Sequence, residues 1–93
     1  MDTQKGFGIK LTGTPPVVLN FQDDVLECFF EDGSTRVHVI HIKAIDLADN
    51  KGKYLLTIHL NNNDLFIWVD AKQIVPVREL IDQLKQAMAA SRS

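Results

Sequence analysis

The chain has 93 residues, which is enough for one small domain and too few for two. Apolar residues make up 45% of the sequence and charged residues 24%, the balance of a folded globular protein and not of a disordered or collagen-like chain. The net charge is −2, so the chain lacks the positive field that attracts polyphosphate backbones, and we expect no nucleic-acid partner.

The single cysteine, Cys28, cannot form an internal disulfide, which predicts a reducing, cytoplasmic location. The first residues lack the charged-then-apolar pattern of a signal peptide, and no apolar run reaches the roughly 18 residues that cross a membrane. We therefore expect no targeting segment and no membrane span.

The first half of the chain reads as short strands. Residues 1–16 contain three glycines and two prolines, too many breaks for a helix, yet apolar residues alternate at 7–11. This leader is predicted to be either an arm or an edge strand. From residue 17 a period of two is clear over 17–21 and again over 26–30, with Gln22-Asp23-Asp24 between, which predicts a β-hairpin.

Two further turns separate the next strands. A polar turn at 31–34 precedes a β-branched stretch at 35–42, which predicts a third strand. A second polar turn at 61–64 leads to the last predicted strand at 65–69.

Between these strands the sequence Asn50-Lys51-Gly52 predicts another hairpin turn. A simple three-residue loop would place Asp46 opposite Leu56 and so mix the polar and apolar faces of the hairpin. A β-bulge near 49–53 would restore the pattern, and we expect one there.

After Asp70 the apolar period changes from two to 3.6, which predicts one amphipathic helix. Pro76 fits the first turn of this helix, where its missing N–H costs nothing, so a separate turn is expected at 71–74. Residues 89–93 are expected to fray. The predicted buried face of the helix consists of Val77, Leu80, Ile81, Leu84 and Met88.

Six or seven short strands followed by one helix predict a mainly β fold, a bent antiparallel sandwich or barrel whose open end the C-terminal helix caps. This order resembles the pleckstrin-homology-like (PH-like) domains, in particular the small bacterial ones. The resemblance is carried by residues 33–45, Gly33-Ser34-Thr35-Arg36-Val37-His38-Val39-Ile40-His41-Ile42-Lys43-Ala44-Ile45, and by Phe66-Ile67-Trp68-Val69 passing into 78–84. It implies a PH-like domain over residues 17–93, with 1–16 as its leader.

Lipid-binding members of that superfamily hold an inositol phosphate with lysines and arginines in and after the first hairpin loop. This chain offers Gln22-Asp23-Asp24 there, whose carboxylates would repel phosphate, so we do not expect phosphoinositide binding. A peripheral membrane or lipid-headgroup binder is the alternative function, with Lys43, Lys51 and Lys53 as its candidate residues. The simpler interpretation of these lysines is that they are solvated charges.

The histidines could act as metal ligands or as acid and base in an enzyme. A cluster of His38, His41 and His59 with Asp46 could hold zinc or nickel, and we expect His38 and His59 to point outward from neighbouring strands. No ligand spacing supports such a cluster, so we assign no metal, no cofactor and no catalytic residue. Cys28 alternates with core positions and is predicted to be a small buried apolar residue.

Three aromatic residues, Phe29, Phe66 and Trp68, fall on the strand faces opposite the predicted core. The helix, the leader or another chain must cover this surplus, and the simplest interpretation is that Phe66 and Trp68 lie under the helix. Aromatic residues are also the preferred anchors of protein interfaces. We therefore expect a non-catalytic interaction module, a homo-oligomer or one that binds a protein partner, through a sheet edge or through the surplus apolar face.

Overall fold

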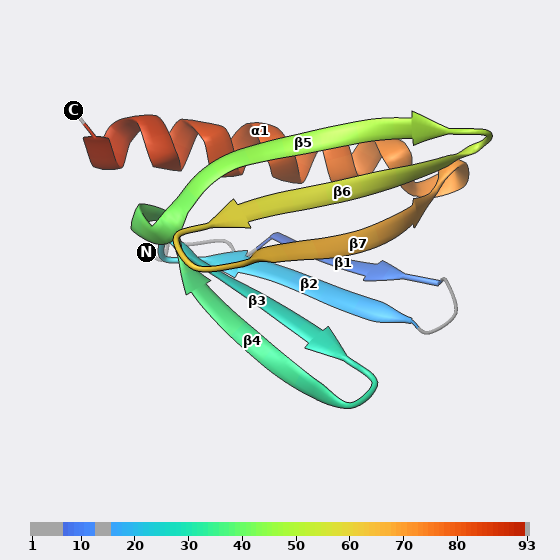
Figure 1. Ribbon diagram of the computed structural model, residues 1–93, viewed down its shortest axis with the longest axis horizontal. Helices are drawn as coiled ribbons and strands as arrows, with labels where there is room; N and C mark the ends of the chain where they lie inside the picture. The colour runs from blue at the N-terminus through green and yellow to red at the C-terminus, as the bar shows by residue number, and fades with distance from the viewer. Residues whose placement is uncertain (1–6, 13–15, 93) are drawn as a thin grey trace, which may run out of the picture.

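The computed structural model describes residues 7–12 and 16–92. In that part of the chain it shows two antiparallel sheets and one C-terminal helix (Figure 1), which confirms the predicted mainly β sandwich with a helical cap. The first sheet has the order β1-β2-β3-β4, with strands at Phe7–Leu11, Val17–Gln22, Val25–Phe30 and Gly33–His38. The second has the order β5-β6-β7, with strands at Ile42–Asn50, Lys53–Leu60 and Asp64–Asp70.

Of the predicted leader, residues 7–11 form β1, an edge strand that pairs antiparallel with β2. Ile9 and Leu11 point into the same core as the later strands and are buried. The first hairpin therefore joins β1 to β2, and the hairpin with Asp23 and Asp24, predicted as the first, is the second. Residues 1–6 and 13–15 lie outside the described part.

The turn between β2 and β3 consists of Asp23 and Asp24, whose φ angles are 55° and 65°. Two-residue hairpin turns adopt this left-handed conformation because its twist matches that of the strands. The carbonyl of Asp24 also accepts a hydrogen bond from the Val39 N–H at 2.9 Å. The turn thus holds the segment by which the chain passes from one sheet to the other.

Replacing Asp24 by glycine is expected to raise the free energy of unfolding by about 1 kcal/mol, because glycine adopts a positive φ without steric cost. Urea unfolding followed by circular dichroism measures the change. The control is Asp32→Gly in the next turn, a residue without a positive φ, where glycine is expected to lower stability by about 0.5 kcal/mol. Equal effects at the two positions would contradict the explanation.

The predicted third strand at 35–42 is interrupted in the structure. β4 ends at His38, a single 3₁₀ turn, η1, spans Val39–His41, and β5 then begins in the second sheet. The His38 Nδ1 accepts a hydrogen bond from the Ile40 N–H at 3.2 Å and caps this turn, while the Val39 side chain is buried. The β-branched residues favour a strand locally, but the change of sheet overrides that preference.

The turn between β5 and β6 is shorter than predicted. Asn50 pairs with Lys53, which leaves only Lys51 and Gly52 in the turn, with φ angles of 52° and 87°. Positive φ at both central residues is what the commonest two-residue hairpin turn requires, and glycine supplies it readily.

This turn also determines the register of the hairpin. Leu47 lies opposite Leu56, so apolar residues share one face without any insertion. The expectation of a bulge near 49–53 is therefore wrong, because a two-residue loop and not a three-residue loop closes the hairpin. The irregularity of this ladder lies at its other end, between Ile42 and Ala44.

A separate turn precedes the helix, as predicted. The 3₁₀ turn η2 spans Ala71–Gln73 and is capped by the Asp70 side chain, which accepts from the Lys72 N–H at 3.1 Å. The helix α1 then runs over Ile74–Arg92, with Pro76 in its first turn and no break over 89–92. The Gln73 amide donates to the Lys10 carbonyl at 2.7 Å and so fastens the start of the helix to the end of β1.

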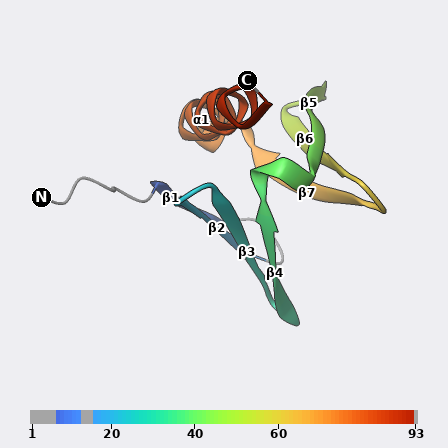
Figure 2. The same cartoon turned by 90° about the vertical axis from the view of Figure 1, so that its left-hand side faces the viewer.

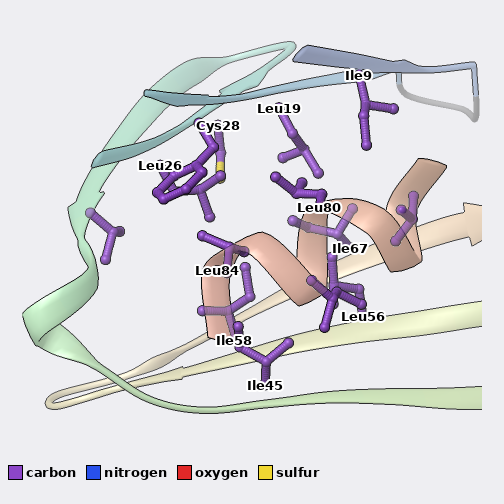
Figure 3. Close-up of a cluster of buried hydrophobic side chains, with 14 of the residues drawn as sticks. Ile9, Leu19, Leu26, Cys28, Ile45, Leu56, Ile58, Ile67, Leu80 and Leu84 are labelled. Carbon is purple, nitrogen blue, oxygen red and sulfur yellow. The ribbon is translucent and has the colours of Figure 1, made fainter. Parts of the chain in front are cut away.

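The two sheets diverge from η1, and α1 lies in the opening between them (Figure 2). Figure 3 shows Leu80 and Leu84 between side chains of the first sheet, such as Leu19 and Leu26, and side chains of the second sheet, such as Ile58. The hydrophobic core is thus enclosed by the two sheets and by the helix. Its buried residues are those predicted, Val77, Leu80, Ile81, Leu84 and Met88.

Candidate functional site

The outer face of the β5–β6–β7 sheet carries the largest adjoining apolar side chains on the surface of the described chain. Trp68 lies opposite Leu55, and Phe66 lies opposite Thr57, so the register places both aromatic residues and their partners on one side of the sheet. Leu55 of β6 thus lies between Trp68 of β7 on one side and Ala48 of β5 on the other. We call this surface the aromatic face, made up of Ala48, Leu55, Thr57, Phe66 and Trp68.

The aromatic face is open to solvent. The side chain of Phe66 is 62% exposed and that of Trp68 is 52% exposed, whereas the alternating residues Ile67 and Val69 are buried. The helix and the first sheet both lie on the opposite side of this sheet (Figure 2). The interpretation that Phe66 and Trp68 lie under the helix is therefore wrong.

Phe29, the third predicted interface residue, belongs to a different surface. It lies in β3 opposite Val18 and Ser34, on the outer face of the first sheet, and is 43% exposed. The structure brings Phe66 and Trp68 together and leaves Phe29 apart from them. Alternation along a strand identifies the outward residues, but it does not show which sheet carries them.

A charged cluster borders the aromatic face at the end where β6 meets β7. Each ring nitrogen of His59 lies at hydrogen-bonding distance from a carboxylate: Nε2 is 2.8 Å from Asp46 Oδ2, and Nδ1 is 3.1 Å from Asp64 Oδ1. Both nitrogens donate when the ring is protonated. The three residues come from three neighbouring strands. The pKa of His59 is raised above its ordinary 6.5. The hydrogen bond to Asp46 is the largest cause, and the hydrogen bond to Asp64 and the negative charge of Asp64 add to it.

We expect the pKa of His59, measured by NMR titration, to lie above 6.5 and to fall toward that value in Asp46→Asn, because Asp46 is the largest cause of the shift. The protonated pair stabilises the fold fully below pH 6.5, and this contribution is lost as the pH rises through the raised pKa. Asp49→Asn on the same strand is the control. A His59 titration that does not move in Asp46→Asn would contradict the assignment.

The three histidines do not form a site. His38 lies in β4 of the first sheet and His59 in β6 of the second, so the expectation of neighbouring strands is wrong; His41 lies in η1, with Nδ1 3.5 Å from the Asn61 amide. Among the described residues no group of histidine, cysteine, aspartate and glutamate side chains could hold a metal ion. Asp46 and Asp64 approach opposite ring nitrogens of His59, so the three side chains do not converge on one point.

Cys28 is fully buried in β3, as predicted, and its neighbours are apolar core residues (Figure 3). Burial raises the pKa of this thiol to about 11. A nucleophilic cysteine needs the opposite shift, since the thiolate is the reactive form. Cys28 therefore has a packing role.

The three candidate headgroup lysines are divided between the two ends of β5. Lys51 and Lys53 lie at the turn between β5 and β6, whereas Lys43 lies at the start of β5, eight residues from Lys51 and roughly 26 Å away along the strand. A headgroup with several phosphate charges needs several cations within a few ångströms. The structure does not gather the three lysines into such a cluster.

No protein-family model matches this sequence, and comparison with curated proteins finds no match. The resemblance to PH-like domains therefore stays a prediction. Within the described residues, no helix has the length and apolar character needed to cross a membrane.

Proposed function

We propose that this protein is a non-catalytic interaction module that self-associates through the aromatic face. The observation that carries the proposal is the exposure of Phe66 and Trp68, two positions apart on β7, on the outer side of a sheet whose inner side is already packed. Covering two such rings removes apolar area worth on the order of 2 kcal/mol for each ring.

The face supports this proposal better than the β5 edge of the same sheet does. β5 is an edge strand of this sheet. Its pairing register with β6 shifts between Ile42 and Ala44, and it carries the exposed carboxylates of Asp46 and Asp49. Bulges and charges of this kind oppose the addition of another strand. On the aromatic face the charged neighbour is Asp46, which lies opposite Thr57 on the β5 side, while Leu55, Phe66 and Trp68 form the uncharged centre.

The proposed module works in a reducing compartment, which we take to be the cytoplasm. Cys28, the single cysteine, is a buried free thiol that packs in the core and needs no oxidising environment.

Trp68→Ala is expected to weaken self-association by at least about 30-fold in Kd, because a central tryptophan contributes roughly 2 kcal/mol or more to an interface. Light scattering over a dilution series measures the mass, and circular dichroism checks the fold. The matched control is Val75→Ala, which shortens another exposed apolar side chain, 74% exposed, at the start of α1.

The control should keep the mass profile of the parent protein. A parent protein that stays monomeric up to about 1 mM, where association would contribute less than roughly 4 kcal/mol, would overturn the proposal. So would a Trp68→Ala variant that associates as strongly as the parent.

A further inference from the structure

A hollow of about 270 Å³ opens between the two sheets beside β4. Its walls come from three segments: the middle of β4, the 3₁₀ turn η1, and the turn between β6 and β7 with the strand residues on either side of it. The Leu60 N–H donates to the Asn63 carbonyl at 2.8 Å, which closes that turn. β4 and β7 are edge strands of different sheets, so no ladder of hydrogen bonds joins the two sheets here.

The base of the hollow consists of side chains that face the core. Val37 is buried, and Thr35, two residues earlier in β4, is half-buried. Leu60 and Leu65 are half-buried and pack against the core cluster. Leu65 has the same facing along β7 as the buried Ile67. The base is therefore mainly apolar, with one hydroxyl group from Thr35.

The rim of the hollow carries hydrogen-bond donors. They belong to exposed residues and are the guanidinium of Arg36, the imidazole of His41, and the side-chain amides of Asn61, Asn62 and Asn63. His41 Nδ1 lies 3.5 Å from the Asn61 amide nitrogen, which can only donate, so Nδ1 accepts and Nε2 carries the proton of the neutral ring. That tautomer leaves the Nε2–H as a donor for a ligand.

Among the described residues that line the hollow there is no carboxylate, although acidic residues outnumber basic ones in the chain. Two acidic side chains at neighbouring positions have other partners. Glu27 Oε2 lies 3.0 Å from Arg36 Nε, and the Asp64 carboxylate lies 3.1 Å from the His59 ring. The ion pair with Glu27 uses the Nε–H of the guanidinium, so the N–H groups on its two terminal nitrogens remain for a ligand.

The size of the hollow restricts the class of ligand. Its volume equals that of about nine waters, which suits a molecule of roughly that number of non-hydrogen atoms. Drug-sized ligands and cofactors occupy larger sites, of roughly 300–1,000 Å³. A nucleotide is therefore too large, and a small organic acid fits.

We propose that this hollow binds a small carboxylic acid with a short hydrocarbon chain. A carboxylate accepts two parallel N–H bonds from a guanidinium and further bonds from an imidazole and from amides, while the chain covers the apolar base. The ligand is small and the site is open, so we expect a Kd on the order of 1 mM. The inference does not depend on self-association, because the hollow lies on the inner side of the second sheet and the aromatic face on its outer side.

A titration with sodium hexanoate at constant ionic strength tests the proposal, because hexanoate combines one carboxylate with a short unbranched chain. NMR spectra of the backbone amides are recorded along the titration. Saturable shifts are expected at residues 35–37, 41 and 60–65. Hexanol lacks the carboxylate and inorganic phosphate lacks the chain, so each is expected to bind roughly tenfold or more weakly than hexanoate.

Arg36→Gln is expected to weaken hexanoate binding roughly tenfold or more, because hydrogen bonds to charged groups are the strong ones. His41→Ala removes one further donor and should weaken binding about threefold. The matched control is Arg78→Gln, the same change at an exposed arginine of α1, whose guanidinium lies 5.9 Å from the centre of the Tyr54 ring near the other end of β6. The control should bind hexanoate as the parent does, and circular dichroism checks that each variant is folded.

Three results would overturn the proposal. The first is the absence of saturable shifts around the hollow, or shifts confined to Leu55 and Trp68, which would place the chain on the aromatic face. The second is binding of phosphate as tight as that of hexanoate, which would indicate a general anion site that makes no use of the apolar base. The third is equal binding of hexanoate by the parent and by Arg36→Gln.

Discussion

Leu84→Ala is expected to lower the free energy of unfolding by about 3 kcal/mol. Leu84 is fully buried in α1 and lies between the two sheets, so its removal leaves a cavity that neither sheet fills (Figure 3). For a domain of this size that is a large share of a total of roughly 5–10 kcal/mol. Urea unfolding followed by circular dichroism measures the loss.

The matched control is Lys85→Ala, the next residue of the helix, which is exposed and should change stability by less than about 0.5 kcal/mol. A loss below about 1 kcal/mol in Leu84→Ala would show that the helix is not a wall of the core. The angle between the two sheets, and with it the outward exposure of the second sheet, would then need another cause.

The second large effect concerns Cys28 at alkaline pH. Burial raises the pKa of the thiol from 9.0 to about 11, so the unfolded chain releases the proton at a lower pH than the folded one. Stability from this residue is complete well below pH 9 and is lost as the pH rises through 9 and past 11, by about 3 kcal/mol in all for a shift of two pKa units.

Cys28→Ala isolates this effect, because the variant lacks the thiol but keeps every other group that titrates in the same range. The difference in unfolding free energy between parent and variant should shift by about 2 kcal/mol against the parent between pH 9 and 11. Parallel stability curves for the two proteins over this range would contradict the burial of an ionisable thiol.

Local patterns predict the elements of this fold well where one physical rule dominates. The period of 3.6 after Asp70 identified the buried face of α1, because the helix has a single apolar stripe. Pro76 correctly separated the helix from the turn before it. The strand at 35–42 was predicted too long, since the need to change sheets at η1 appears in no local pattern.

The register of the β5–β6 hairpin was predicted wrongly because the turn was taken to be three residues long instead of two. Lys51-Gly52 suits the two central positions of a tight hairpin turn, and counting outward from them pairs Asp46 with Thr57. That register places Asp46 diagonally beside His59, so the charged cluster could have been found from the sequence. The assumption of a three-residue loop paired Asp46 with Leu56 instead, so the cluster was not predicted.

For the candidate site, alternation predicted that Phe66 and Trp68 face away from the core, and the structure shows them exposed. It grouped Phe29 with them because facing within a strand says nothing about which sheet the strand joins.

The most direct test of the central claim uses Trp68, the single tryptophan of the chain, as a probe within the aromatic face. Acrylamide quenching of its fluorescence is measured over the same dilution series as the mass. We expect strong quenching in the dilute monomer, where the ring is 52% exposed, and weaker quenching as the mass doubles. A mass that doubles while the quenching stays constant would contradict it, because the copies would then associate through another surface.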